Sequence, residues 1–393
     1  MKVTKLFKEF FDSEKSSGII LIICTVLSLL CVNIFIGEQY LDFWHHKTLP
    51  SLEVFKLNMS LEHWINDGLM AIFFLMVGLE IEREIYIGEL SDTRNAMVPV
   101  FAAIGGMLVP AVFHFILNAG TATQNGFGIP MATDIAFALG IMALVGKRVP
   151  FVLKVFLTAL AIIDDLGAIL VIAVFYTKEI STLYLFTALG VFLVLLILNR
   201  LKVYRLVFYL LGGVIMWYCF LRSGVHATIA GVLLAFAIPF GDGGEKSMSY
   251  KLQHFLHKPV AFIILPLFAL ANTGILFHGS LTEIISTNNS LGILSGLIVG
   301  KPLGIVTLLF IGVKLKIIKL PEGIKWKHIA AAGFLAGIGF TMSIFTTLLA
   351  FDDQGLIANS KIAVLISSFG AGIIGFLFLK WSVKDDHLVQ IPS

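Results

Sequence analysis

Charged side chains are scarce in this sequence. Asp, Glu, Lys and Arg make up 13% of its 393 residues, whereas a typical soluble domain contains about 25%. Hydrophobic residues make up 58%, and the mean hydropathy is +0.94. A soluble fold of this length needs more polar surface than the chain supplies. The composition therefore excludes a soluble enzyme.

Cysteines and clustered basic residues are also few. Cys24, Cys31 and Cys219 lie in apolar stretches without metal-site spacing, so we interpret them as small apolar residues. No basic face interleaved with aromatic residues is visible, so we expect no nucleic-acid partner. The first apolar run is too long for a signal-peptide core and lacks a small-x-small cleavage site, which favours a retained helix.

Long apolar runs are what the sequence has in abundance, and about 20 apolar residues suffice for a helix to cross a bilayer. We predict an all-α integral membrane protein with about twelve transmembrane helices. The predicted spans are about 18–36, 64–81, 95–117, 127–145, 150–176, 181–199, 203–220, 223–240, 259–277, 290–312, 328–350 and 359–380.

The loops between these spans carry an asymmetric charge. With a cytoplasmic N-terminus, 22 of the 28 Lys and Arg residues fall on the cytoplasmic side, five fall outside, and Lys301 lies within a span. This bias is typical of an inner-membrane protein and predicts that both termini are cytoplasmic. The longest external loop, 37–63, allows either a short hairpin or an unstructured connection.

Ionisable residues inside membrane spans are costly, so each is a candidate functional residue. Five positions stand out: Asp67, Asp134, Asp164, Asp165 and Lys301. Asp67 lies near the external end of its span, where an interfacial cap explains it as well as a function does.

The adjacent carboxylates Asp164 and Asp165 are the central candidates. Neighbours on a helix point about 100° apart, so one can face a packed partner while the other faces a cavity. A structural ion pair with Lys301 would occupy only one of them. Burial and mutual repulsion make carboxylates hold protons more tightly, and ionised carboxylates are hard oxygen ligands for Na⁺. A group that binds either H⁺ or a metal cation is the minimum requirement for an antiporter.

Two spans are poor continuous helices. The fourth contains Pro130 before Thr133 and Asp134, and the eleventh contains three glycines and two hydroxyls within Gly333–Phe345. Interrupted helices in corresponding positions of two halves indicate a midplane binding site between inverted repeats. Small residues for close helix packing also account for these glycines, but they do not explain Asp134.

Together these stretches resemble the NhaA-type sodium/proton antiporter family, along essentially the whole chain. The matching motifs are Trp64–Phe74, Val77–Glu80, Gly128–Gly140, Ala159–Ala168, Arg222–Thr228, Leu265–Ala269 and Gly337–Ile344. The resemblance implies that Asp164 and Asp165 bind the transported Na⁺. It also implies that Thr133 and Asp134 lie where the two interrupted helices cross, and that Lys301 pairs with Asp164.

The resemblance further implies a cytoplasmic pH-response cluster. Its members would be Glu80, Arg83, Glu84 and His254, with His226 and His257 as weaker members. Two departures bear on this cluster: Gln253 replaces an acid that the family has, and Glu82 stands where a lysine is common.

These inferences lead to one expected function, the electrogenic and pH-regulated exchange of cytoplasmic Na⁺ or Li⁺ for external H⁺. We expect a single membrane domain over 1–393, with 95–176 and 290–380 as an inverted-repeat ion-binding core. Segments 18–94 and 181–277 would form the interface and scaffold. The expected partners are the lipid bilayer and a second copy bound through the 37–63 loop. No catalytic residue and no cofactor are expected.

Three other classes of protein remain as alternatives. An intramembrane aspartyl protease also needs two membrane aspartates, but no span contains Gly-x-Gly-Asp. A channel fits less well, because a titratable pair with a lysine favours tight binding over rapid passage. A cation-coupled symporter of organic anions with a related fold would need a larger polar pocket.

Overall fold

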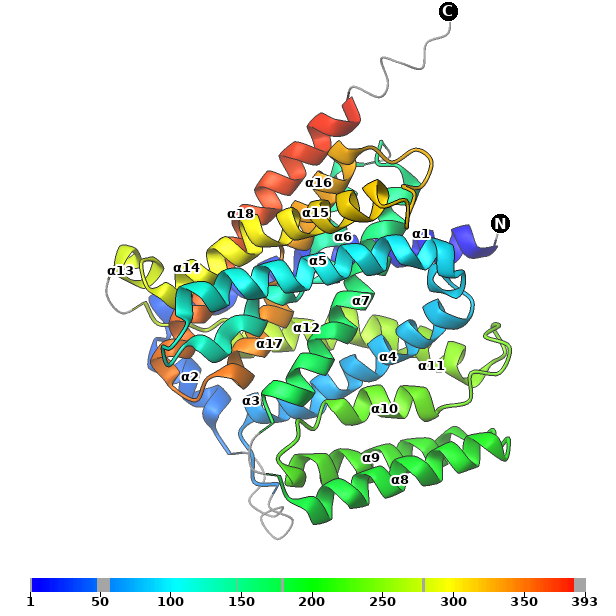
Figure 1. The fold of residues 1–393 in the computed structure, drawn as a ribbon. Helices are drawn as coiled ribbons and strands as arrows, with labels where there is room; N and C mark the ends of the chain where they lie inside the picture. Colours follow the sequence, from blue (N-terminus) through cyan, green and yellow to red (C-terminus); the bar gives the residue numbers. More distant parts are fainter. Residues whose placement is uncertain (1, 48–56, 147, 178–179, 278–279, 385–393) are drawn as a thin grey trace, which may run out of the picture. The chain divides into compact units, whose positions relative to one another are not determined.

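The computed structural model describes residues 2–47, 57–146, 148–177, 180–277 and 280–384, and these are helical without a β-strand (Figure 1). The α-helices are α1 (Lys2–Leu30), α2 (Glu38–His45), α3 (Leu61–His63), α4 (Met70–Tyr86), α5 (Thr93–Asn118), α6 (Ile135–Val145), α7 (Phe151–Phe175), α8 (Thr182–Arg200), α9 (Leu206–Ser223), α10 (Ile229–Ala237), α11 (Met248–Pro259), α12 (Leu265–Asn272), α13 (Leu281–Ile285), α14 (Asn288–Ser295), α15 (Lys301–Lys314), α16 (Trp326–Ala336), α17 (Phe340–Ala350) and α18 (Gln354–Lys384). Shorter 3₁₀ or π-helical turns are Cys31–Phe35, Trp64–Leu69, Glu89–Ser91, Gln124–Met131 (η5), Val260–Ile264 and Gly296–Gly300 (η7).

Ten helical segments of the described chain are long and apolar enough to cross a membrane, and the α16–α17 pair, bent by 48°, gives an eleventh. This result supports a multi-pass membrane protein, but it falls short of the twelve spans predicted. The difference lies at 223–240, where α10 has only nine residues. At 1.5 Å per residue, such a helix is about 14 Å long, less than half of the hydrocarbon core.

Contacts within the chain define two compact units, and each is described by itself. Unit 1 comprises 1–22, 89–168 and 277–393, and unit 2 comprises 23–88 and 169–276. Most of both segments predicted as inverted repeats falls in unit 1. The repeat relationship itself stays a prediction.

Unit 1 is built around a close packing of α5 against α15, which run side by side in Figure 1. Gly105 and Gly304 make this approach possible. A Cβ atom on Gly105 would lie 2.2 Å from the Gly304 carbonyl oxygen, and one on Gly304 would lie 2.0 Å from that of Gly105. Because neither glycine has a side chain, the two backbones come into direct contact, which brings Lys301 at the start of α15 against α5.

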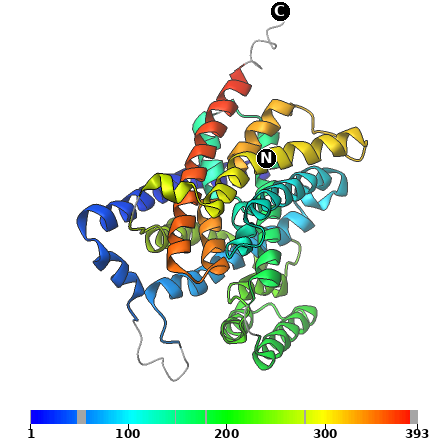
Figure 2. The ribbon, with the colours of Figure 1, turned by 60° about the vertical axis from the view of Figure 1, so that its left-hand side comes forward.

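Unit 2 has a similar glycine contact between α4 and α10. A Cβ atom on Gly231 would lie 2.1 Å from the Ala71 carbonyl oxygen, and one on Gly78 would lie 2.6 Å from the Ala235 Cβ. These contacts set α10 parallel to α4, with the start of α10 beside Ala71. In the same unit α8 and α9 form an adjacent pair, drawn in green in both ribbon views (Figures 1 and 2).

The predicted external loop 37–63 is only partly visible. Helix α2 lies within it, and Lys47 and Ser60 form an isolated antiparallel bridge. Residues 48–56, on which the hairpin and dimer predictions depend, lie outside the described residues. Both therefore stay predictions.

Candidate ion-binding site

Asp164 and Asp165 lie in the middle of α7, a 25-residue helix of unit 1 in which apolar side chains flank the pair on both sides. Both carboxyl groups are buried, with exposed fractions of 0% and 2%. A carboxylate removed from water needs a cation, a proton or several hydrogen bonds. The groups around these two side chains therefore decide how their negative charge is balanced.

Lys301 is the cation that faces Asp164. Its Nζ lies 2.9 Å from Asp164 Oδ2, and both side chains are completely buried. Lys301 Nζ also donates to the carbonyl oxygen of Met131, the last residue of η5. Thr133 adds a hydroxyl 2.7 Å from the same Asp164 Oδ2. The other oxygen of Asp164, Oδ1, has no hydrogen-bond partner among the described residues.

Asp134 joins the two interrupted spans. Its Oδ1 accepts from the backbone N–H of Phe137 at 2.9 Å and so caps the N-terminus of α6. Its Oδ2 accepts from both the N–H and the hydroxyl of Thr341, at 3.1 and 2.6 Å, in the first turn of α17. One carboxylate thus sits at two helix N-termini, each of which carries partial positive charge.

The corresponding helix C-termini meet donors instead. The Met131 carbonyl at the end of η5 accepts from Lys301, and the Ala336 carbonyl at the end of α16 lies 2.9 Å from Thr133 Oγ1. A backbone hydrogen bond from the Asp134 N–H to the Ile338 carbonyl oxygen, with an N···O distance of 2.7 Å, also joins the two interrupted spans. Both helix N-termini therefore meet a carboxylate, and the C-terminal end of η5 meets an ammonium group. The Thr133 hydroxyl has one proton and lies between the Ala336 carbonyl and Asp164 Oδ2.

Sequence reasoning missed two hydroxyl-bearing residues of this site, Thr341 and Ser343. The Thr341 hydroxyl donates a hydrogen bond to Asp134, and Ser343 Oγ donates one to the Ile129 carbonyl oxygen in η5, 2.6 Å away. The signal was present in Gly337–Ile344, where two hydroxyls follow the glycines. Without the partner helix, however, they could not be distinguished from residues that favour close packing.

The predicted pH-response residues lie in unit 2. The Arg83 guanidinium lies 4.9 Å from the centroid of the Tyr250 ring, and Tyr250 stacks on His254 with a centroid distance of 6.1 Å. These contacts bring the end of α4 to α11. Glu80 and Glu84 lie on α4 on either side of Arg83, and the Glu84 carboxylate folds against Gly88. Glu82, one of the two departures, is buried, with an exposed fraction of 5%.

The structure does not place His226 with that cluster. His226 precedes α10, whose start lies beside Ala71, whereas Arg83 is at the other end of α4. Its Nε2 lies 3.0 Å from the Tyr176 carbonyl oxygen. His257 does lie on α11, one turn after His254. The prediction that groups His226 with the Arg83 cluster is thus not matched by the geometry.

Asp67 lies in unit 2, in the helical turn Trp64–Leu69. Its Oδ2 pairs with His63 Nε2 at 2.9 Å, and its backbone carbonyl accepts from Trp217 Nε1 at 2.8 Å. The interfacial-cap interpretation and a function for Asp67 both stay predictions.

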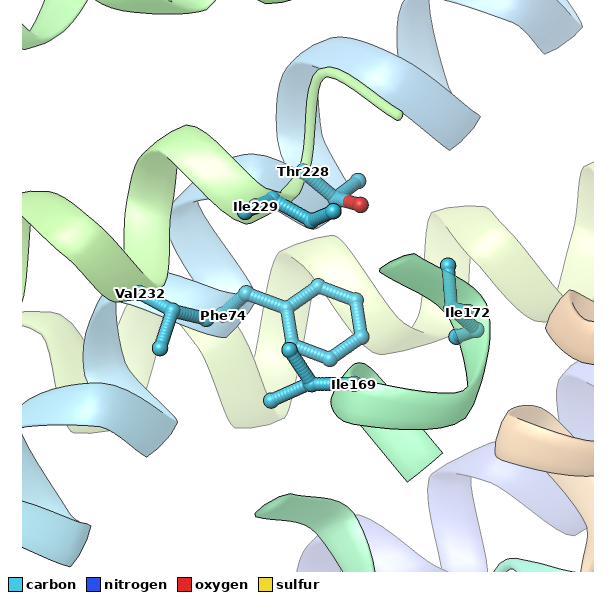
Figure 3. Close-up of a pocket in the computed structure, with 6 residues that line it drawn as sticks. All are labelled: Phe74, Ile169, Ile172, Thr228, Ile229 and Val232. Atoms are coloured by element: carbon cyan, nitrogen blue, oxygen red, sulfur yellow. The ribbon is translucent and has the colours of Figure 1, made fainter. Parts of the chain in front are cut away.

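A small pocket in unit 2 is apolar. It is lined by Phe74, Ile169, Ile172, Thr228, Ile229 and Val232, and Thr228 contributes its only polar side chain (Figure 3). Nowhere in the described ranges do three or more His, Cys, Asp or Glu side chains gather in a metal-binding group.

The fold and the site define a polytopic membrane protein with buried, charge-compensated groups at two helix breaks, as in an ion-coupled transporter. The family model described as Na⁺/H⁺ antiporter 1 matches residues 8–379, and the chain belongs to this family. It is 61% identical over 385 residues to the Na(+)/H(+) antiporter NhaA of Flavobacterium psychrophilum, covering 98% of both chains. It is also 58% identical over 390 residues to the Na(+)/H(+) antiporter NhaA of Dechloromonas aromatica, covering 98% of both chains. The identity to the Na(+)/H(+) antiporter NhaA 1 of Flavobacterium johnsoniae is 59% over 381 residues, which cover 97% of this chain and 98% of that protein.

Proposed function

We propose that this chain exchanges cytoplasmic Na⁺, or Li⁺, for external H⁺, and that Asp164 and Asp165 bind both kinds of cargo. The observation that carries the proposal is the pair of adjacent buried carboxylates on α7 with a single buried lysine against one of them. When both carboxyl groups are ionised they carry two negative charges, and Lys301 supplies one positive charge. A proton or a metal cation can supply another, so H⁺ and Na⁺ compete for the same site.

Lys301 takes part in this competition. Its ammonium occupies Asp164 Oδ2, the oxygen that also faces the Thr133 hydroxyl. A Na⁺ ion bound between the two aspartates would have to share or displace that ammonium. Asp134 and Thr133 act differently: they hold the two interrupted spans together beside the Asp164 carboxylate.

Exchange should move net charge. The site offers two titratable groups to one monovalent cation, counting either both aspartates or Asp165 with the Asp164–Lys301 pair. An uncompensated charge in mid-membrane is expensive, so the inward-moving form carries protons at each titrating position. Two protons inward for one Na⁺ outward transfers one net positive charge into the cell.

A transport assay tests this proposal. The purified protein is reconstituted in vesicles with equal pH on both sides, and valinomycin with K⁺ imposes an inside-negative potential. Each net charge gains roughly 2.3 kcal/mol per 100 mV, so the potential alone should expel Na⁺ against its gradient. An unaffected final Na⁺ ratio would show one-for-one exchange, and the absence of Na⁺-dependent proton movement would overturn the function itself.

We place the protein in the bacterial inner membrane with both termini cytoplasmic, supported by the bias of Lys and Arg in the loops. Segments 95–176 and 290–380 would form inverted repeats whose interrupted helices cross at mid-membrane, and 37–63 would form a homodimer contact. The Arg83–Tyr250–His254 stack, with Glu80, Glu84 and His257, would adjust exchange to cytoplasmic pH.

A further inference from the structure

His114 is a buried histidine of unit 1 that the proposed exchange does not use. It lies on α5 with no exposed surface. Gly106, two turns earlier on the same face, lies against Lys301: a Cβ atom on Gly106 would be 3.7 Å from Lys301 Cε. His114 is thus about 12 Å further along the helix face that packs against the ion site's lysine.

A directed chain of hydrogen bonds begins at His114. Ser360 Oγ donates its only proton to the Leu356 carbonyl at 2.6 Å, so it must accept from Asn289 Nδ2, 2.7 Å away. This fixes the orientation of the Asn289 amide, and its Oδ1 faces His114 Nε2 at 3.1 Å. The chain therefore runs from α5 through α14 to α18, with each donor matched to an acceptor.

This chain also determines the protonation of the imidazole ring. Nε2 carries a hydrogen because Asn289 Oδ1 can only accept. Nδ1 is buried and has no hydrogen-bond partner in the described part of the chain, so a hydrogen there would find no acceptor. His114 is consequently the neutral tautomer protonated on Nε2, and its ring orientation is set by one bond.

The same ring fills the space between η5 and α14. A Cβ atom on Gly126, in η5, would lie 2.9 Å from His114 Cε1, and one on Gly292, in α14, would lie 2.7 Å from His114 Cδ2. A side chain on either glycine would meet the ring, and one on Gly126 would also meet Phe351 Cζ at 2.8 Å. The ring is therefore clamped between the first half of the interrupted fourth span and the helix that carries Asn289.

We propose that His114 is a positioning residue for the ion site. The ring holds the start of η5 in place. It thereby also sets the position of the Met131 carbonyl oxygen at the end of η5, which accepts a hydrogen bond from Lys301. Gly126 and Met131 are about 10 Å apart along a 3₁₀-helix, so a displacement at Gly126 moves the backbone that leads to the Met131 carbonyl. A shifted Met131 carbonyl weakens the hold on Lys301, which then competes differently with Na⁺ for Asp164. This inference rests on the proposed exchange at Asp164 and Asp165.

The test compares three variants of the full chain in proteoliposomes, with Na⁺ as the only varied ion. His114→Leu keeps the bulk but removes the donor to Asn289. His114→Gln keeps an N–H donor near the position of Nε2. Gly126→Ala places a methyl group from η5 against the ring and against Phe351 Cζ. We expect His114→Leu and Gly126→Ala to change the apparent KM for Na⁺ by about tenfold, the lower range for groups that support an ion's ligands, and His114→Gln to restore it.

A matched control separates positioning from general destabilisation. Leu379→Ala creates a cavity on α18 in the same unit, at a fully buried position far along the helix from Ser360. It should lower the melting temperature and leave KM unchanged. An unchanged KM in both His114→Leu and Gly126→Ala, or an equal change in Leu379→Ala, overturns the inference. If His114→Leu fails to reach the membrane, Gly126→Ala alone decides. Wild-type protein without Na⁺-dependent proton movement would instead refute the proposed function.

Discussion

Asp134 and Thr341 are 207 positions apart in the sequence and form a double hydrogen bond, in which one carboxylate oxygen accepts from both the N–H and the hydroxyl of Thr341. The other oxygen of Asp134 caps α6. The N-termini of α6 and α17 are thereby fixed by a single side chain. This contact explains why an acid is placed at a helix break inside an otherwise apolar span.

Removing the Thr341 hydroxyl should weaken this contact. We expect Thr341→Val to lower the free energy of unfolding by about 1.5–3 kcal/mol, the usual contribution of a hydrogen bond to a charged group, and to reduce exchange. Thr341→Ser keeps the hydroxyl and serves as the control. Thermal unfolding in detergent measures the difference, and equal melting temperatures for the two variants would show that the backbone N–H alone holds Asp134.

Neutralising either aspartate of the pair should abolish exchange. In Asp164→Asn and Asp165→Asn, an amide neither carries the transported proton nor offers a full charge to Na⁺. Na⁺-dependent proton movement in proteoliposomes is the measurement, with membrane insertion checked separately. Asp42→Asn, which changes an exposed carboxylate on α2, should remain active. Normal exchange by Asp165→Asn would remove that residue from the site.

Loss of Lys301 should reduce stability as well as activity. Lys301→Ala leaves the buried Asp164 carboxylate without its cation, a change that typically costs about 3–5 kcal/mol. Lys314→Ala, at the exposed end of the same α15 helix, is the control and should melt like the wild type. Unchanged melting of Lys301→Ala would show that Asp164 in the folded protein is proton-bound or reached by water.

The stack of Arg83, Tyr250 and His254 allows a test of pH regulation. Histidine generally changes charge between about pH 5 and 8. If protonation of His254 inhibits exchange, His254→Ala lacks that positive charge at low pH, so the acid side of the activity curve should move to lower pH while the maximum persists. Lys251→Ala, an exposed neighbour on α11, should leave the curve in place.

Restoring the missing acid beside this stack gives an independent measurement. Gln253→Glu adds a titrating group next to His254, where the family pattern has a carboxylate. The activity curve should shift along the pH axis. If neither His254→Ala nor Gln253→Glu moves it, competition between H⁺ and Na⁺ at the aspartate pair sets the pH response by itself.

The sequence by itself determined the features that depend on local composition. A membrane-spanning, all-helical protein follows from apolar runs of bilayer length, because each such helix satisfies its own backbone. Local composition also singles out the candidates Asp134, Asp164, Asp165 and Lys301, because a charge in an apolar span is costly whatever its neighbours. Local pattern was less reliable at 223–240, where a long apolar run contains only the nine-residue α10.

Only the tertiary structure decided which of these groups meet. Thr341 and Ser343 looked like packing residues until α17 was placed against Asp134 and η5, and His114 gave no signal before α14 and α18 supplied Asn289 and Ser360. His226, in turn, proved to lie at the opposite end of α4 from Arg83. A hydrogen bond or ion pair depends on atoms within about 3 Å, and residues far apart in the chain reach that distance only through helix packing. In this protein the packing is set by glycines at which two backbones touch, a property of pairs of helices that no single segment contains.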